Sequence, residues 1–398
     1  MPTLSKLTQR MSGPSSAAWD VGDLAFEMMR DGEDIIHLGV GDPDLDTPIS
    51  IQETACTAIK NGKTHYAPIP GENGTRETIA LHASKLYGGH INADQVVVCA
   101  GAQSALFTTF LCLAGPGDEV IVLEPSYATY PAVVTAGGAN MVTVVLDKND
   151  GYQLDLAKIK SAVTPRTKAI LINSPGNPSG AVFTQNALNE LSQFCTEQSI
   201  WLVSDEVYWS LCYDGPHASP YKLTDAAPQL RDNIIVVNSL SKSHAMTGWR
   251  IGWALGPKHF AQAMATLAQA SQFGVTQFVQ DAAITALNDK ASAQEFRSIF
   301  KARRDALCGA LAKCEALQFS KPSGGMFVLS DVSRTGLNGE EFAHRLLHDE
   351  KVAVVPGFGF GASMSNTVRI GFLCEQNRLR EAARRINKFA DNLCYLLS

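Results

Sequence analysis

The sequence predicts an α/β protein built around a mainly parallel sheet. Between about residue 75 and about residue 290, short apolar runs rich in Val and Ile alternate with helical segments. Glycine, proline or charged residues bound each run, which is typical of strands buried on both faces of a parallel sheet. The runs are Gln95–Cys99, Glu119–Leu123, Met141–Val145, Ala169–Asn173, Trp201–Ser204, Ile234–Asn238 and Ile251–Leu255.

The pattern changes after about residue 290 and predicts a smaller α+β domain. A long helix from Ala291 to about Leu317 comes first, and a closing helix begins near Gln376. Three short apolar runs between these helices predict strands: Met326–Leu329, Ala353–Pro356 and Thr367–Gly371.

Two further helices are expected near the N-terminus, at about 16–31 and about 48–61. The first is opened by Ser15 or Ser16, or by Asp20 as its cap.

The length of 398 residues suggests two or three domains. We expect residues 1–40 to form an N-terminal arm that packs with the small domain. Residues 41–290 then form a large cofactor-binding domain, and residues 291–398 form the small C-terminal domain.

Composition and charge exclude several classes of function. Hydrophobic residues make up 45% of the chain, which excludes extensive disorder. The net charge of −6 creates no overall field that would attract nucleic acid or anionic lipid. No apolar run approaches the roughly 18–20 residues of a membrane span. The first 19 residues hold too few basic residues for a transit peptide, so we expect a cytoplasmic protein.

Metal and dinucleotide sites are not expected. The nine cysteines form no C-x-x-C pair and the nine histidines no H-E-x-x-H motif, which indicates reduced thiols and no metal site. The segment Gly357–Ala362 matches G-x-G-x-x-A, but a strand follows it where a dinucleotide site needs a helix.

The most informative stretch is Asn238–Gly252, N-S-L-S-K-S-H-A-M-T-G-W-R-I-G. Lys242 follows an apolar strand, hydroxyl side chains flank it, and Arg250 lies eight residues further on. Arginine binds phosphate through planar charge-assisted hydrogen bonds. Cationic surroundings and desolvation lower the pKa of a lysine and make its amine nucleophilic. A reactive amine beside a phosphate site indicates pyridoxal phosphate held as a Schiff base.

Three other segments supply what that cofactor requires. Asp205 ends a strand, where its carboxylate can keep a pyridine nitrogen protonated, and Tyr208 follows within reach of the phenolic oxygen. Asn177 lies in a turn rich in Pro and Gly after another strand, and can reach both cofactor and substrate carboxylate. The segment Ala100–Ala105 opens a helix after a strand, where backbone N–H groups favour a phosphate.

These motifs resemble those of fold-type I pyridoxal-phosphate aminotransferases of class I/II, the group similar to aspartate aminotransferase. The resemblance runs from Gly39-Val-Gly-Asp-Pro-Asp44 to Asn366-Thr-Val-Arg-Ile-Gly371, with the motifs in family order. It implies the fold described above, a homodimer with shared active sites, and amino acids and 2-oxo acids as substrates. It implies no nucleic acid and no membrane as partners.

The resemblance also implies roles for individual residues around the cofactor. Lys242 matches the Schiff-base lysine and Asp205 the partner of the pyridine nitrogen. Tyr208 and Asn177 match the partners of the phenolic oxygen, and Tyr127 the aromatic side chain that stacks on the ring. The phosphate ligands of the family match Arg250, Ser239, the backbone of Ala102 and Gln103, and, as a further candidate, Ser241.

The remaining matches concern the substrate and the dimer. Arg369 matches the clamp for the substrate α-carboxylate, and Gly41 the glycine whose backbone assists it. Tyr66 matches the tyrosine that reaches the phosphate across the dimer interface. Members of the family often have cis peptide bonds before prolines at the positions of Pro125 and Pro178.

Each of these residues also has a simpler interpretation. Lys242 alone would be an ordinary surface lysine, and Tyr127 or Tyr66 alone a core aromatic. Arg369 lies inside an apolar strand, where an unpaired charge is costly, so a ligand or a buried partner is expected. Because the other motifs occur in the same chain, we favour the functional interpretation of all four residues.

The implied reaction is a two-stage, ping-pong transamination. The Lys242 amine removes the substrate α-proton and returns it at the cofactor carbon, acting as general base and then general acid. Asp205 keeps the ring nitrogen charged and so stabilises the negative charge that develops.

The amino donor is less well defined by the sequence. Dicarboxylate-specific members of one subgroup use a second arginine, but the corresponding stretch, Ser271–Gln277, holds no basic residue. Four segments are instead similar to bacterial arginine–pyruvate transaminases: Ala17–Asp20, Val40–Asp44, Gly101–Ala105 and Asn238–Arg250. This implies a basic donor and pyruvate as acceptor. Asp20 and Asp23 are candidates to bind a guanidinium, although in the simpler interpretation Asp20 caps the first helix and Asp23 lies in its first turn.

Other functions remain open. Alanine-, aspartate- or aromatic-type transaminases are the first alternatives, and a C–S β-lyase on the same fold is another. A cofactor-binding regulatory module is the non-enzymatic alternative, but no basic helix-turn-helix segment precedes residue 40.

Overall fold

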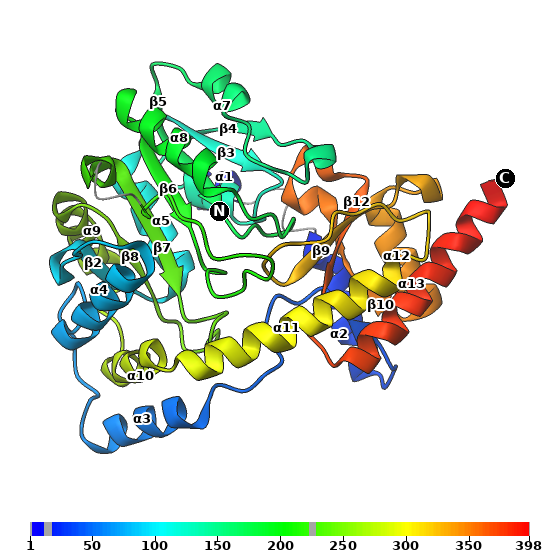
Figure 1. The fold of residues 1–398 in the computed structure, drawn as a ribbon, viewed down its shortest axis with the longest axis horizontal. Coiled ribbons are helices and arrows are strands. Elements are labelled where there is room, and N and C mark those ends of the chain that lie inside the picture. The colour runs from blue at the N-terminus through cyan, green and yellow to red at the C-terminus, as the bar shows by residue number, and fades with distance from the viewer. Residues whose placement is uncertain (1, 12–17, 223–227, 398) are drawn as a thin grey trace.

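A computed structural model describes residues 2–11, 18–222 and 228–397. Its centre is a seven-stranded sheet with helices on both faces, and a second, smaller layer of strands and helices lies beside it (Figure 1). The strand order is β2-β8-β7-β6-β5-β3-β4, and all neighbours are parallel except the two pairs that involve β8. The expected fold class, α/β with a mainly parallel sheet and a smaller α+β part, is confirmed.

All seven predicted apolar runs form the strands of this sheet. The strands are β2 (Val96–Cys99), β3 (Glu119–Glu124), β4 (Asn140–Val145), β5 (Thr167–Asn173), β6 (Trp201–Asp205), β7 (Ile234–Ser239) and β8 (Gly252–Leu255). Alternate residues of each strand face opposite sides of the sheet. Val97 and Cys99 pack in one apolar core, and Val96 and Val98 in another, so the strands read as continuous apolar runs.

Helices cover both faces of the sheet. One core contains side chains of α5 (Gly101–Leu113), α6 (Tyr130–Thr135) and α9 (Lys258–Ser271). The core on the other face contains side chains of α3 (Ile49–Lys60), α4 (Asn73–Tyr87), α7 (Leu156–Ala162), α8 (Gln185–Glu197) and α10 (Gln277–Asn288). The predicted helix at about 48–61 is therefore confirmed as α3, which packs against α10 at the lower left of Figure 1.

The second layer has its own core and two small sheets. A three-stranded antiparallel sheet has the order β11-β12-β9, and a two-stranded parallel sheet joins β1 to β10. The elements are α2 (Asp20–Arg30), β1 (Ile36–His37), α11 (Lys290–Leu311), β9 (Phe327–Asp331), α12 (Gly339–Glu350), β10 (Val352–Ala353), β11 (Val355–Pro356), β12 (Thr367–Gly371) and α13 (Gln376–Leu397). Chain segments near both ends thus share one core. The expected domain boundaries, after residues 40 and 290, stay predictions.

Several local expectations need correction. The run Ala353–Pro356 is not one strand, because β10 pairs with β1 while β11 pairs with β12. The long helix α11 ends at Leu311, six residues earlier than expected. Asp20 does not cap α2: it is the first helical residue, and Trp19 occupies the cap position without a side-chain hydrogen bond. Ser15 and Ser16 lie outside the described residues.

The N-terminal arm is divided between the two layers. Val21, Ala25 and Met28 of α2 lie in the core of the second layer. The short helix α1 (Lys6–Met11) instead contacts α6, which belongs to the large sheet. The expectation that residues 1–40 act as one arm of the small domain stays a prediction.

Three further features bear on the expectations. After β11 come two 3-10 turns and then β12, so no helix follows the G-x-G-x-x-A segment. All nine cysteines are free thiols. Among the described residues, no helix is long and apolar enough to cross a membrane.

Candidate active site

A cavity of about 390 Å³ lies at the carboxyl ends of β5, β6 and β7, beside the first turn of α5. Ligands of open α/β sheets bind at this edge. Thirteen residues were matched from the sequence to cofactor, α-carboxylate or dimer contacts, and twelve of them line the cavity: Gly41, Ala102, Gln103, Tyr127, Asn177, Asp205, Tyr208, Ser239, Ser241, Lys242, Arg250 and Arg369. Segments from both layers therefore meet at one site, as the motif order predicts.

Lys242 lies three residues beyond the end of β7 and is half-buried in the cavity wall. Its Nζ donates a hydrogen bond to the carbonyl oxygen of Gly41 at 2.5 Å. Burial lowers the pKa of Lys242 to about 8; Asp42 opposes this, and the charges of Arg369 and Arg250 add to it. More of this amine is uncharged at neutral pH than of an exposed lysine, so it can act as a nucleophile or base.

Asp205 ends β6 and is buried, with its carboxylate facing the cavity. Its Oδ2 accepts a hydrogen bond from Tyr130 Oη at 2.7 Å, and its Oδ1 accepts one from the Val207 N–H at 3.2 Å. Burial raises the pKa of Asp205 to about 6, which the two hydrogen bonds oppose. Among the described residues no cation forms an ion pair with Asp205, so this buried carboxylate fits a positively charged ligand atom.

The first turn of α5 and Arg250 form the anion-binding end of the cavity. The helix begins at Gly101 without a side-chain cap, so its first N–H groups are available to an anion. Gly101 has φ +83°, and a Cβ there would lie 2.5 Å from Arg250 Nη2. At Gly252 a Cβ would lie 2.7 Å from the Ala102 nitrogen. Both glycines therefore allow the guanidinium and β8 to approach the helix terminus closely.

Arg369 lies in β12 and is almost fully buried, at 1% exposure. Its Nη1 donates to Asn177 Oδ1 at 3.0 Å and its Nη2 to the carbonyl oxygen of Gly39 at 2.7 Å. Its Nε is buried without a hydrogen-bond partner among the described residues. Burial lowers the pKa of Arg369 to about 10. A buried guanidinium that faces a cavity without a carboxylate partner fits an anionic ligand.

Aromatic side chains surround the guanidinium of Arg369. The ring centre of Phe327 lies 4.0 Å from its Cζ, that of Phe360 4.9 Å and that of Trp19 5.6 Å. Such stacking holds the planar group in one orientation and excludes water from it.

Tyr208 and Asn177 are joined to each other on the cavity wall. Asn177 Nδ2 donates to Tyr208 Oη at 3.4 Å, while its Oδ1 accepts from Arg369. Burial raises the pKa of Tyr208, so this phenol stays protonated at neutral pH. Asn177 thereby links the two groups for which the sequence proposed cofactor and substrate contacts.

The family profile of class I and II aminotransferases matches residues 33–386. The chain belongs to this family. An arginine–pyruvate transaminase of Pseudomonas aeruginosa is 43% identical over 383 residues, which is 96% of each chain. An aspartate/prephenate aminotransferase of Thermus thermophilus is 37% identical over 389 residues, 97% of this chain and 98% of that one. A solved structure of a T. thermophilus aspartate aminotransferase with maleate superposes with a TM-score of 0.91 at 36% identity, covering 98% and 100% of the two chains.

This aminotransferase is therefore an enzyme, and it depends on pyridoxal phosphate as the other members of its family do. Its cavity fits that cofactor: an anion-binding helix terminus lies at one end, and a buried carboxylate without a cation and a half-buried lysine line the same space. The expected cis peptide bonds before Pro125 and Pro178 are present, with a third before Pro175.

Two sequence-derived residues of the aminotransferase are placed differently from the rest. Tyr66 is 82% exposed and lies outside the cavity, edge-on to Phe273 with ring centres 5.1 Å apart. Gly41 lines the cavity, but its carbonyl accepts from Lys242, and it is Gly39 that contacts Arg369. The family roles of Tyr66 and Gly41 stay predictions.

Sequence reasoning missed three residues of the aminotransferase site. Tyr130 donates a hydrogen bond to Asp205, while Trp19 and Asp42 line the cavity. Asp42 was within a quoted motif, and its acidic charge beside Gly41 was an available signal. Tyr130 ends the same segment as Tyr127, but only the pairing of β3 with β5 and of β5 with β6 brings it to Asp205. Asp20 and Asp23 are both exposed and do not line the cavity.

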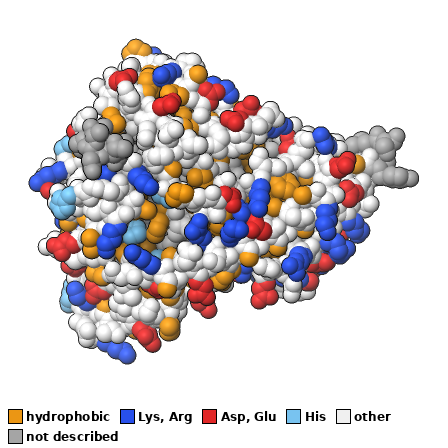
Figure 2. Space-filling view, viewed as in Figure 1, with side chains coloured by type: hydrophobic (Ala, Val, Ile, Leu, Met, Phe, Trp, Pro, Cys, Tyr) orange, Lys and Arg blue, Asp and Glu red, His pale blue; other side chains and the backbone are white. Residues whose placement is uncertain are grey.

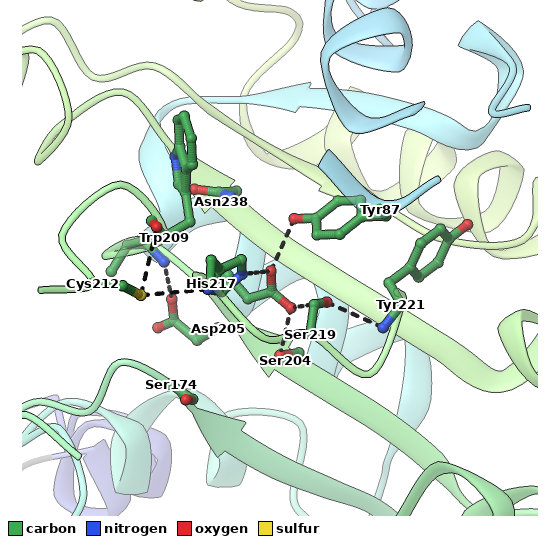
Figure 3. A network of polar contacts seen from close by, with 12 residues as sticks. Tyr87, Ser174, Ser204, Asp205, Trp209, Cys212, His217, Ser219, Tyr221 and Asn238 are labelled. Carbon is green, nitrogen blue, oxygen red and sulfur yellow. Dashed lines mark hydrogen bonds and ion pairs between the residues drawn. The ribbon is translucent and has the colours of Figure 1, made fainter. Parts of the chain in front are cut away.

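A buried polar network lies next to Asp205 (Figure 3). Glu206, at 0% exposure, accepts hydrogen bonds from Tyr87 Oη at 2.9 Å and Ser219 Oγ at 2.6 Å. It also pairs with His217 Nε2 at 2.6 Å. Burial by itself would lower the pKa of His217, but the Glu206 carboxylate and the hydrogen bonds raise it to about 9. His217 is therefore protonated at neutral pH, and its contact with Glu206 anchors the loop that follows Asp205.

His217→Gln is expected to remove a pH-dependent part of the stability. Because the folded-state pKa lies above the ordinary 6.5, protonated His217 stabilises fully below pH 6.5, and this is lost as the pH rises to about 9. The wild type should resist urea better than the variant, and the difference should be largest at pH 6. There the two free energies of unfolding should differ by at most about 3 kcal/mol. Parallel loss of stability in both proteins between pH 6 and pH 9 would contradict the assignment.

Proposed function

We propose that this enzyme transfers the amino group of a basic amino acid, arginine foremost, to pyruvate by a ping-pong mechanism. The observation that carries the proposal is the charge of the cavity. Its only lining cations within the described residues are Lys242, Arg250 and Arg369. Each has a task at the cofactor or the α-carboxylate, so none remains for a second substrate carboxylate. The carboxylate of Asp42 at the mouth suits a cationic donor instead.

The comparisons support more than one donor. The P. aeruginosa relative is named for arginine and pyruvate, which favours the proposal. The relatives named for aspartate and prephenate favour a dicarboxylate donor instead. Aspartate is therefore the second candidate, and the charge of the cavity weighs against it.

When bound, pyridoxal phosphate supplies the aldehyde that takes the amino group and a ring that stores the electrons of the broken C–H bond. We propose that Arg250, Ser239, Ser241 and the N–H groups of Ala102 and Gln103 hold its phosphate. Asp205, kept in place by Tyr130, holds the ring-nitrogen proton. Tyr208 and Asn177 bond the phenolic oxygen, and Tyr127 packs on the ring.

The chain's own groups then carry out the proton transfer. Arg369 and the Gly41 backbone hold the substrate α-carboxylate, which fixes the direction of the α-proton. The Lys242 amine takes that proton and later returns it. The surrounding aromatic side chains keep water from the reacting atoms. One water supplies the carbonyl oxygen of the 2-oxo acid that leaves. Pyruvate then enters and takes up the amino group through the same proton transfers in reverse order.

The donor's guanidinium is proposed to lie against Asp42. This side chain is exposed at the cavity mouth, and its Oδ1 accepts a hydrogen bond from Thr247 Oγ1 at 2.6 Å. The bond fixes one oxygen of the carboxylate and orients the other. Trp19, also at the mouth, offers an aromatic face to the same cation.

A panel of donors with pyruvate tests the proposal. Arginine is expected to exceed alanine, aspartate and aromatic donors in kcat/KM by at least about tenfold, the gain of one charge-assisted hydrogen bond. In Asp42→Asn the KM for arginine should rise about fivefold, with the KM for alanine unchanged. Asp20→Asn, an exposed carboxylate outside the cavity, is the matched control. A kcat/KM for arginine at or below that for alanine would refute arginine as the donor but would leave the family assignment intact.

A homodimer with shared active sites is part of the proposal. Tyr66 is highly exposed beside an exposed Phe273, and this pair forms an aromatic surface that a second copy of the chain can cover. We propose that Tyr66 of that copy reaches the cofactor phosphate. Tyr66→Phe should then weaken cofactor binding in the dimer. If gel filtration shows a monomer and that monomer is fully active, the shared site is contradicted.

A further inference from the structure

A second cavity, of about 600 Å³, lies outside the catalytic one, between α4, the loop after β6 and the first turns of α11. Basic and histidine side chains gather beside apolar ones on this face of the molecule (Figure 2). The volume lies within the range of small-molecule sites. None of the residues assigned above to cofactor or substrate lines this cavity.

The walls are largely apolar. Leu81 and Leu86 of α4, Leu287 of α10, and Trp209 and Pro216 of the loop all contribute. Leu81 is 53% exposed and adds to the apolar lining that a ligand could cover. A ligand here therefore needs an apolar body.

The charge of the cavity has one sign. Lys85, Lys290 and Arg297 line it, and no acidic residue is among its described lining residues. Within the described part of the chain, none of these three cations forms an ion pair. His217, the fourth basic group, is already neutralised by Glu206. An anionic group on the ligand would complement this excess of positive charge.

Three polar atoms of the wall have no hydrogen-bond partner among the described residues. They are Trp209 Nε1, His82 Nε2 and Ser210 Oγ, all shut off from solvent. The His82 and Trp209 rings meet edge-on, with centres 4.8 Å apart. A buried donor without a partner destabilises the folded chain. A ligand oxygen that reaches one of them after a small rotation would remove that destabilisation.

The same loop lines both cavities. Asp205 and Tyr208 face the catalytic cavity, while the next two residues, Trp209 and Ser210, face the second. The turn is tight, because the Trp209 N–H donates to the Glu206 carbonyl at 2.9 Å. One peptide unit therefore joins a residue of the catalytic cavity wall, Tyr208, to a residue of the second cavity wall, Trp209.

We propose that this second cavity binds a small amphipathic carboxylate and that its occupation changes the turnover of the catalytic site. The apolar body lies among the leucines and Trp209. The carboxylate lies towards Lys85, Lys290 and Arg297. The binding step is independent of the donor proposed above, so its failure would leave that proposal intact.

Calorimetric titration of the holoenzyme with phenylacetate tests the binding, with phenylacetamide as the neutral probe. The double variant Lys85→Gln/Lys290→Gln should bind phenylacetate at least tenfold more weakly than the wild type. Lys168→Gln/Lys313→Gln removes two exposed lysines elsewhere and should change nothing. Ala293→Phe fills the cavity from α11 and should abolish binding without a change of charge.

Three results would overturn the proposal. The first is equal phenylacetate affinity in the two double variants. The second is binding that survives in Lys85→Gln/Lys290→Gln but is lost in Arg369→Lys, which would place phenylacetate in the catalytic cavity alone. The third is no binding of phenylacetate up to about 10 mM.

Kinetics test the coupling between the two cavities. At saturating donor, phenylacetate should change kcat at least twofold in the wild type and not in Lys85→Gln/Lys290→Gln. A purely competitive effect, removed by excess donor, would refute the coupling.

Discussion

Lys242→Ala is expected to lower kcat by roughly 10⁴-fold, because one side chain supplies both the bond to the cofactor and the proton transfer. Lys242 is the lysine that lines the catalytic cavity, and its pKa is lowered to about 8 by burial. No other described amine lies in the cavity wall to replace it. Folding should be little affected, since the lost contact is a single hydrogen bond to a backbone carbonyl.

Borohydride labelling distinguishes this loss from a structural one. Borohydride treatment of the wild-type holoenzyme should attach the cofactor permanently to the peptide that contains Lys242, as mass spectrometry will show. The variant should carry no such label but should still bind the cofactor, because Arg250, Asp205 and the α5 terminus remain. Lys168→Ala, an exposed lysine far from the site, is the control. A labelled Lys242→Ala protein would show that another lysine is the reactive one.

Small primary amines provide a second check. If the alanine variant lacks only a base, added methylamine should restore a measurable part of the turnover, in proportion to its unprotonated fraction. An unfolded or distorted variant would not respond.

Much of the fold was predictable because each central strand is buried on both faces. Val96–Cys99 and Ile234–Ser239 have no polar alternation, and a buried parallel strand produces that pattern directly. The failures lie where a short segment depends on its partner. Val352–Ala353 and Val355–Pro356 read as one apolar run, but they are two strands because they pair with different sheets.

The candidate site was predictable to the extent that its residues lie in local motifs. Lys242, Asp205 and Asn177 each follow a strand, so topology brings them to one edge of the sheet. Trp19 lies in the quoted segment Ala17–Asp20 and Tyr130 lies three residues after Tyr127, but neither was predicted to reach the site, because their positions depend on how α2 and α6 pack. The second cavity was beyond prediction for the same reason: α4, α10 and α11 form it only in the folded chain.

Arg369→Lys is expected to raise the KM for every amino acid while kcat falls less. Lysine keeps the charge but loses the planar fork that now bonds Asn177 and Gly39 and leaves Nε for a ligand. A hydrogen bond to a charged group contributes about 1.5–3 kcal/mol, so kcat/KM should fall roughly 10- to 150-fold. A ground-state contact that persists in the transition state appears mainly in KM.

An amine without a carboxylate separates the clamp from general damage to the site. Agmatine is arginine that lacks its α-carboxylate, so it cannot use the Arg369 contact. The wild type should prefer arginine over agmatine strongly, and Arg369→Lys should reduce that preference by lowering kcat/KM for arginine alone. Equal losses for both donors would show that the buried guanidinium only supports the surrounding aromatic side chains, Phe327 and Phe360 among them. An unchanged KM for arginine would remove the clamp role altogether, because no other described cation in the cavity wall is left for the α-carboxylate once Lys242 and Arg250 serve the cofactor.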